Sequence, residues 1–242
     1  MKYILVIPAR FKSTRFPGKP LVLINGKTMI QRVYEQCLQS VSQEKIYVAT
    51  EDIRILEFCE GNGIQCILTS DKCLTGTDRV GEVAKLIDAD FYINVQGDEP
   101  IFNPKDIDLL INELNLKSKT IYDVYCGFTR IIEAERFFSK DVPKTVVNIK
   151  NELLYISRSS IPGNKNGDFN HGYRQVCAYA FSKKSLQIFC SQKRKTFLEE
   201  QEDIELLRFL DLGIKVKMIK MSEDSIPVDR KDDLQRVLKK LK

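Results

Sequence analysis

The sequence predicts an α/β fold, a doubly wound, mostly parallel sheet with helices on both faces. In residues 1–95, short apolar segments rich in β-branched residues alternate with segments of helical periodicity, which gives the order β-α-β-α-β-α-β. That order requires right-handed crossovers and hence parallel neighbours. A length of 242 residues with 43% apolar side chains suffices for one large domain and does not require two.

The first half contains the most regular pattern. Tyr3 to Ile7 is an unbroken apolar run closed by Pro8, as is typical of a strand buried on both faces. The glycines of Gly61-Asn-Gly63 end the second helix. The expected strands of this half are 3–7, 45–49, 64–68 and 91–95, and the expected helices are 29–38, 52–60 and 80–87.

The second half is less regular. Its expected helices are 107–114, 183–190, 202–212 and a last one that begins at Asp229, and its expected strands are 123–128, 145–157, 174–181 and 215–221. A segment rich in Gly, Asn and Lys, 162–172, separates two of these strands. Since no repeat or low-complexity linker marks a boundary, we expect a single domain, 1–242, with an insertion at about 145–200.

A basic loop follows the first strand. Between Pro8 and Leu21 lie four cations, namely Arg10, Lys12, Arg15 and Lys19. Ligands bind at the carboxyl ends of the strands in open α/β sheets, so clustered cations there indicate a multiply anionic ligand such as a nucleoside triphosphate. The alternative is an ordinary solvated turn. The loop is not a Walker A motif, because Leu21 stands where the first glycine is needed.

A second polar turn, Gln96-Gly-Asp98, follows the fourth expected strand. Parallel strands bring their carboxyl ends to one edge, so the four cations and the Asp98 carboxylate are expected to share one crevice.

Composition narrows the class of protein. The net charge of +5 favours acidic partners, but the cations are scattered among 33 acids, which favours small phosphorylated molecules over nucleic acid. Seven cysteines without a C-x-x-C pair suggest reduced thiols in a cytoplasmic protein. No apolar run is long enough for a membrane span or a signal peptide. The single histidine, His171, excludes a histidine-rich metal site.

Residues 10–21 follow the pattern R-x-x-S-x-R-x-P-G-K-x-L, and at this point the sequence resembles the 3-deoxy-manno-octulosonate (Kdo) cytidylyltransferase family. The resemblance covers essentially the whole chain. It continues, in the family's order, at Thr75-Gly-Thr-Asp-Arg79, Asn94-Val-Gln-Gly-Asp-Glu-Pro100, Tyr155-Ile-Ser-Arg158, Glu202-x-x-Glu205-x-x-Arg208 and Val228-Asp229.

The resemblance implies a fold like that of nucleotide-diphospho-sugar transferases. It also implies a reaction in which the anomeric hydroxyl of a 2-keto-3-deoxy sugar acid, most of all Kdo, attacks the α-phosphorus of CTP. The implied products are the CMP-sugar, used for lipopolysaccharide or another surface polysaccharide, and pyrophosphate. It also implies a homodimer formed through the insertion at 145–200. Such a transfer depends on alignment and charge neutralisation, which suits a chain with one histidine and no obvious nucleophile.

The resemblance also assigns site residues. Arg10 and Lys19 would spread the charge of the triphosphate, with Arg15 assisting, and together with Asp98 and Asp229 they form the implied catalytic set. The implied nucleotide-binding residues are Ala9, Arg10, Ser13, Arg15, Lys19, Gly76, Thr77, Arg79 and Asp98. The implied sugar-binding residues are Gln96, Arg158, Gln175, Tyr179, Glu202 and Glu205.

Asp98 and Asp229 are implied as ligands of Mg²⁺, a hard ion that takes one or two protein carboxylates plus substrate phosphates. For Asp229 the alternative is a helix N-cap. Glu202, Glu205 and Arg208 also have an alternative, since their spacing fits an ion-pair ladder on the surface of one helix.

Two alternative functions stay open. A related nucleotidyltransferase could activate another sugar acid or a sugar 1-phosphate, and the latter would not require a carboxylate clamp such as Arg158. A nucleotide-binding module without turnover would bind the nucleotide but release no pyrophosphate, and the presence of both Asp98 and Asp229 speaks against it.

The sequence departs from the family's R-H-x-G-x-Y-x-Y segment, where it has Gln175, Cys177 and Phe181 and keeps Tyr179. Glutamine supplies a donor and an acceptor but no titratable charge. We expect Gln175 to line the sugar pocket through hydrogen bonds alone, which could suit an 8-amino analogue of Kdo better than Kdo. His171 is expected to be an exposed loop residue.

Overall fold

The fold comes from a computed structural model that describes residues 1–12, 16–116, 122–223, 225–228 and 230–241. The strands are β1 (Tyr3–Ala9), β2 (Leu23–Ile24), β3 (Lys27–Thr28), β4 (Ile46–Thr50), β5 (Cys66–Leu68), β6 (Phe91–Val95), β7 (Val124–Arg130), β8 (Lys144–Val147), β9 (Leu153–Ser157), β10 (Tyr173–Ser182) and β11 (Val216–Lys220). The α-helices are α1 (Met29–Cys37), α2 (Ile53–Gly61), α3 (Gly76–Leu86), α4 (Pro104–Asn115), α5 (Ala134–Phe138), α6 (Lys183–Cys190), α7 (Phe197–Glu202), α8 (Leu206–Asp211) and α9 (Lys231–Lys240). Two short 3₁₀ helices occupy Lys19–Leu21 and Gln43–Lys45.

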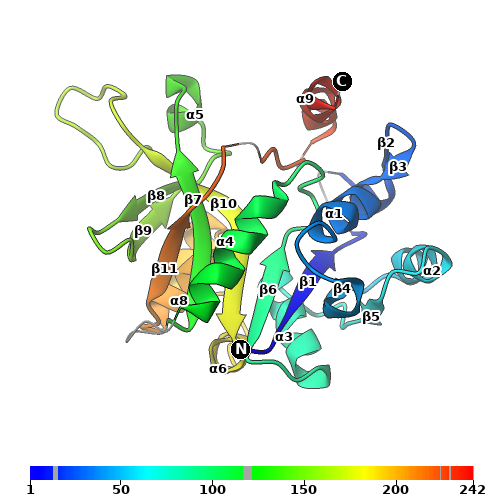
Figure 1. The fold of residues 1–242 in the computed structure, drawn as a ribbon. Coiled ribbons are helices and arrows are strands. Elements are labelled where there is room, and N and C mark those ends of the chain that lie inside the picture. Colours follow the sequence, from blue (N-terminus) through cyan, green and yellow to red (C-terminus); the bar gives the residue numbers. More distant parts are fainter. Residues whose placement is uncertain (13–15, 117–121, 224, 229, 242) are drawn as a thin grey trace.

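The central sheet has the order β11-β7-β10-β6-β1-β4-β5 (Figure 1). From β6 to β5 all neighbours are parallel, as the alternating pattern of the first half predicts. Only β10 runs antiparallel to both of its neighbours in this path, β6 and β7. β10 follows the β8–β9 hairpin rather than a crossover helix, so it enters the sheet from the opposite end. The prediction of a mostly parallel sheet is confirmed.

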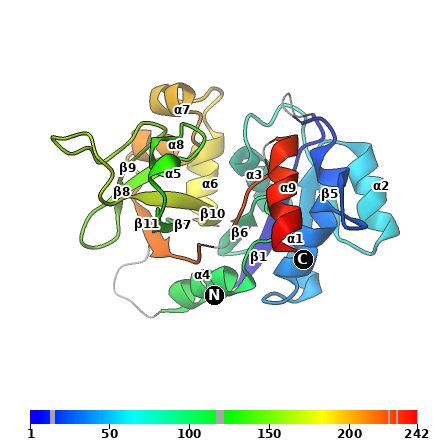
Figure 2. The ribbon, with the colours of Figure 1, turned by 90° about the horizontal axis from the view of Figure 1, so that it is seen from above.

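Helices cover both faces of the sheet, as predicted (Figure 2). Apolar residues of α1, α2 and α4 pack on one face, and those of α3, α6 and α8 pack on the other. The last helix, α9, returns to the first half, where Val237 packs with Phe16, Ile24 and Met29. The C-terminal helix therefore packs beside the end of the basic loop and the start of α1.

Two predicted elements were wrong in their boundaries. The expected strand 145–157 is a hairpin of β8 and β9, whose turn has Asn151 at a positive φ of 55°. The expected helix 202–212 is two helices, because α7 ends at Glu202 and Asp203 adopts a left-handed φ of 51°. Both breaks fall at Asn or Asp, the non-glycine residues that tolerate this backbone region best.

The predicted insertion at 145–200 contains elements of two kinds. β10 and α6 belong to the core, and the β8–β9 hairpin extends the sheet sideways from β10, whereas the loop 158–172 projects away from the sheet (Figure 1). Whether this part mediates a dimer stays a prediction.

Within the described ranges, no helix combines the length and the apolar character that crossing a membrane requires. The seven cysteines are free thiols.

Candidate active site

A cavity of about 290 Å³ opens at the carboxyl ends of β1 and β6, between the two halves of the sheet. The predicted site residues that line it are Ala9, Arg10, Lys19, Gly76, Gln96, Asp98, Arg158, Gln175, Tyr179 and Glu205. Of the other predicted residues, Thr77, Arg79 and Glu202 do not line this cavity, and Ser13, Arg15 and Asp229 lie outside the described residues. The cavity thus joins residues from both halves of the chain.

Lys19 and Asp98 form the polar centre of the first half. Lys19 Nζ donates to Asp98 Oδ2 at 2.8 Å and to the carbonyl oxygen of Val228 at 2.8 Å. The Val228 N–H in turn donates to the Asp98 carbonyl at 2.9 Å. The chain leading into α9 is therefore tied to the Gln96-Gly-Asp98 turn. Of the four cations expected to share a crevice with Asp98, Arg10 and Lys19 line the cavity and Lys12 does not, while Arg15 lies outside the described residues.

Gly97 lets this turn approach the end of β1. A Cβ on Gly97 would lie 2.7 Å from the carbonyl oxygen of Pro8, closer than real contacts allow. Only glycine therefore fits where the two loops meet, and this close approach explains the glycine of the N-V-Q-G-D pattern.

Arg158 forms the polar centre of the second half. Its side chain donates to the carbonyl oxygens of Glu202 at 2.6 Å, Lys140 at 3.1 Å and Asp203 at 3.2 Å. Its N–H donates to Glu202 Oε2 at 2.9 Å, while the Ser157 hydroxyl donates to Glu202 Oε1 at 2.5 Å. Glu202 therefore holds Arg158 and Ser157 in place from behind, and in this structure its carboxylate is not on the cavity wall.

Lys144, on β8, lies behind Arg158 and is fully buried. Its Nζ donates to two carbonyl oxygens, those of Ser139 and Arg158. Burial and the nearby Arg158 cation lower the pKa of Lys144 to about 8.

Glu205 joins the two halves of the chain. Its carboxylate accepts hydrogen bonds from the N–H groups of Gly76 at 3.1 Å and Thr77 at 3.0 Å and from the Thr77 hydroxyl, at the start of α3. A helix N-terminus favours a negative charge at this position. Burial nevertheless raises the pKa of Glu205. Thr77 thus contacts Glu205, not the cavity.

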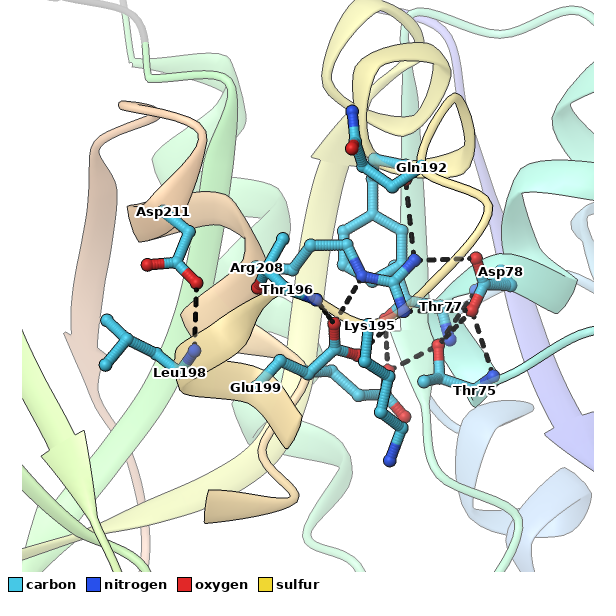
Figure 3. A network of polar contacts seen from close by, with 12 residues as sticks. Thr75, Thr77, Asp78, Gln192, Lys195, Thr196, Leu198, Glu199, Arg208 and Asp211 are labelled. Carbon is cyan, nitrogen blue, oxygen red and sulfur yellow. Dashed lines mark hydrogen bonds and ion pairs between the residues drawn. The ribbon is translucent and has the colours of Figure 1, made fainter. Parts of the chain in front are cut away.

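The alternative of a surface ion-pair ladder is wrong, because Arg208 is fully buried. Figure 3 shows its polar contacts. Its guanidinium binds both carboxylate oxygens of Glu199, at 2.6 and 2.7 Å, and Asp78 Oδ1 at 2.9 Å. Asp78 also accepts the Thr75 N–H in a capping box at the start of α3. This network holds α7 and α8 against α3, so Asp203, Ile204 and Glu205 form part of the cavity wall.

Gln175 is 8% exposed and lies on the cavity wall, where its Nε2 donates to the Tyr179 hydroxyl at 3.0 Å. Burial, first of all, raises the pKa values of Tyr179 and Cys177 well above the ordinary ones. His171 is exposed, as expected, and its ring meets the edge of Tyr173 with centroids 4.7 Å apart.

Arg79 is 1% exposed and pairs with Glu51, with Nη2 and Oε2 2.9 Å apart. Glu51 also accepts the backbone N–H of Phe11 in the basic loop, and the sequence analysis did not single it out. It directly follows β4, at the same edge of the sheet as the basic loop, so the rule that locates ligands at the ends of parallel strands could have found it.

A family model described as cytidylyltransferase matches residues 4–236 of this chain. The chain belongs to this family. The sequence is 39% identical to the Kdo cytidylyltransferase of Desulfatibacillum aliphaticivorans, over 98% of this chain and 97% of that protein. It is 38% identical to the 8-amino-3,8-dideoxy-manno-octulosonate cytidylyltransferase of a Shewanella species, over 100% of this chain and 99% of that protein.

Among solved structures, a CMP:2-keto-3-deoxy-manno-octonic acid synthetase complexed with CTP has the same fold as this cytidylyltransferase. Its TM-score is 0.90 and its sequence identity 35%, over 100% of this chain and 98% of the other. The resemblance to the Kdo cytidylyltransferases is confirmed, and with it the class of enzyme, a nucleotidyltransferase.

Proposed function

We propose that this enzyme transfers CMP from CTP to the anomeric hydroxyl of Kdo and releases pyrophosphate. One observation supports this best. A single cavity is lined by the Lys19–Asp98 pair at the strand ends of the first half and by Arg158 of the second half. The first pair suits a triphosphate and its metal ion, and the arginine suits the carboxylate of a sugar acid.

On the nucleotide side, Arg10 and Lys19 neutralise the triphosphate and orient its α-phosphorus toward the sugar. No covalent intermediate with the protein is needed, because alignment and charge neutralisation account for most of the catalysis in such transfers. Lys19 is held between Asp98 and Val228, so its ammonium group is ordered before the substrate binds.

The donor set at Asp98 fits Mg²⁺. The side chain of Asp98 is 28% exposed and lines the cavity, and a hard divalent ion prefers such a carboxylate together with substrate phosphates. Asp229 is the second proposed ligand. Mg²⁺ would supply charge neutralisation at the phosphates. Among the described residues, no group of three or more His, Cys, Asp or Glu side chains could hold a metal ion by itself.

On the sugar side, Arg158 pairs with the carboxylate of Kdo, and Gln175 and Tyr179 offer hydrogen bonds to its hydroxyl groups. Glu202 acts indirectly, by orienting Arg158. Glu205 shapes the wall between the two substrates through its bonds to the start of α3.

The test is pyrophosphate release measured over a grid of nucleoside triphosphates and sugar acids. We expect CTP with Kdo to be strongly preferred and Lys19→Ala to lower turnover severely. Equal rates with UTP or ATP would contradict the assignment to CTP. Binding of CTP without pyrophosphate release in the presence of any sugar acid would support a nucleotide-binding module instead.

The 8-amino analogue of Kdo is the second candidate substrate, because Gln175 lies on the cavity wall and the Shewanella relative is as similar as the Kdo enzymes. Gln175→His should change the ratio of kcat/KM for Kdo and for the 8-amino sugar by a few fold, an effect of about 1 kcal/mol on discrimination. His171→Ala serves as the control and should leave this ratio unchanged. An unchanged ratio in Gln175→His would show that the residue does not contact the sugar.

A homodimer formed through the segment 145–200 is part of the same proposal. Sedimentation equilibrium of the purified protein tests it, and a monomer at micromolar concentration would contradict it.

A further inference from the structure

We propose that Glu51 is a positioning residue that, with Arg79, anchors the base of the basic loop and so presents Arg10 and Lys19 to the triphosphate. The inference rests on the proposed function and deepens it. It also changes the role of Arg79. Instead of contacting the nucleotide directly, Arg79 orients Glu51.

The carboxylate of Glu51 connects a buried cation to the backbone of the loop. Its Oε1 accepts the N–H of Phe11 at 3.1 Å and lies 3.5 Å from the N of Lys12. Its Oε2 lies 2.9 Å from Arg79 Nη2, and the two side chains are only 6% and 1% exposed. A buried carboxylate with these partners has little freedom to turn away from the loop.

Arg79 is itself fixed from behind. Its Nη1 donates to the Thr69 hydroxyl and to the carbonyl oxygen of Ser70 at 3.4 Å, just beyond β5. The guanidinium thus connects α3, the segment after β5 and Glu51. The direction of the Glu51 carboxylate is therefore determined by the core and not by the loop.

Phe11 closes the base of the loop. Its carbonyl oxygen accepts the N–H of Gly18 at 3.0 Å, and its ring packs between Gly18 and the guanidinium of Arg54, whose Cζ lies 3.4 Å from the ring centroid. Arg10 directly precedes Phe11 and Lys19 directly follows Gly18. Fixing Phe11 therefore fixes the backbone from which both substrate-facing cations project.

The experiment compares KM for CTP with KM for Kdo in Glu51→Ala. We expect KM for CTP to rise about tenfold, the effect of losing one charge-assisted hydrogen bond that orders the loop. KM for Kdo should stay within about twofold, because Arg158 and Gln175 belong to the other half. A residue needed only for stability would lower the fraction of active enzyme and leave both KM values unchanged.

A double variant distinguishes the two roles of Arg79. If Arg79 acts only through Glu51, then Glu51→Ala with Arg79→Met should raise KM for CTP no further than Glu51→Ala alone. If Arg79 instead contacted the nucleotide, the two effects would multiply, and that result would overturn the inference.

Tyr92→Phe is the matched control. It removes the hydrogen bond that the buried Tyr92 side chain donates to the carbonyl oxygen of Ile87 at 2.8 Å, near the amino ends of β1 and β6 and away from the cavity. It should lower the melting temperature without changing KM for CTP. Amide hydrogen exchange at Phe11 and Gly18 should accelerate in Glu51→Ala and not in Tyr92→Phe.

The exchange measurement needs no turnover, so two failures can be told apart. No pyrophosphate release by the unmodified protein would overturn the proposed function, while faster exchange in Glu51→Ala would still support the anchor. An active enzyme whose KM for CTP and whose exchange rates were unchanged in Glu51→Ala would overturn the inference alone.

Discussion

The two sides of the cavity hold their charged groups in different ways. On the nucleotide side, Lys19 pairs with the side chain of Asp98, and both lie in loops that follow the parallel strands β1 and β6. On the sugar side, the side chain of Arg158 donates to three backbone carbonyls, and the buried Lys144 behind it donates to two. The carboxylate of Glu202 accepts the backbone N–H of Arg158.

This difference has a consequence for the charge that each side offers. Backbone carbonyls hold the Arg158 guanidinium through hydrogen bonds that leave its positive charge available to an acid substrate. The nucleotide side has its cation and its carboxylate in contact, which suits a ligand that arrives with a metal ion. Substitutions on the two sides should therefore affect different kinetic constants.

The largest effect is expected for Asp98→Asn on the nucleotide side. It removes the partner of Lys19 and the proposed metal ligand together, while the backbone bond between Asp98 and Val228 can persist. Turnover should fall about 100-fold to 1,000-fold. Steady-state kinetics and a melting curve check this, and a large fall in melting temperature with turnover intact would show a structural role instead.

A smaller and selective effect is expected for Glu202→Gln on the sugar side. A carboxamide can replace only one of the two carboxylate acceptors, so Arg158 and Ser157 lose part of their support. KM for the sugar acid should rise about tenfold, with KM for CTP unchanged. The control is Glu200→Gln, an exposed neighbour on α7. An equal rise in both KM values would remove the distinction between the two sides.

The smallest effect is expected in the pH dependence of the free energy of unfolding, to which Lys144 contributes. Its pKa of about 8 in the folded protein lies below the ordinary 10.5, so the unfolded chain binds more protons between these values. The folded state should therefore gain stability as pH rises from about 8 to 10.5, by about 1 to 3 kcal/mol, and the gain should vanish in Lys144→Met.

Denaturant unfolding at pH 8 and pH 10 measures this gain, with Lys231→Met, an exposed residue of α9, as the control. The same pH dependence in the parent protein and in Lys144→Met would contradict the low pKa of Lys144.

Much of the nucleotide side could be predicted, because its residues lie next to strands that the apolar pattern of the sequence identifies. Arg10, Lys19 and Asp98 line the cavity, as the motifs and the parallel order of β1 and β6 predict. The motif also pointed to Glu202 and Arg79, but their partners, Arg158 and Glu51, come from distant parts of the chain. A motif gives residue types and order, and it does not say whether a side chain meets the substrate or another side chain.

The sequence by itself determined the layers, the parallel half of the sheet and the edge at which the site lies, since hydrophobic periodicity and strand ends are local properties. Tertiary structure alone decided that 145–157 is a hairpin, that the helix breaks at Asp203, and that Glu205 caps α3. The physical reason is separation along the chain. Arg208 can be buried only because Asp78, 130 residues earlier, and Glu199 neutralise it, and no local pattern contains that contact.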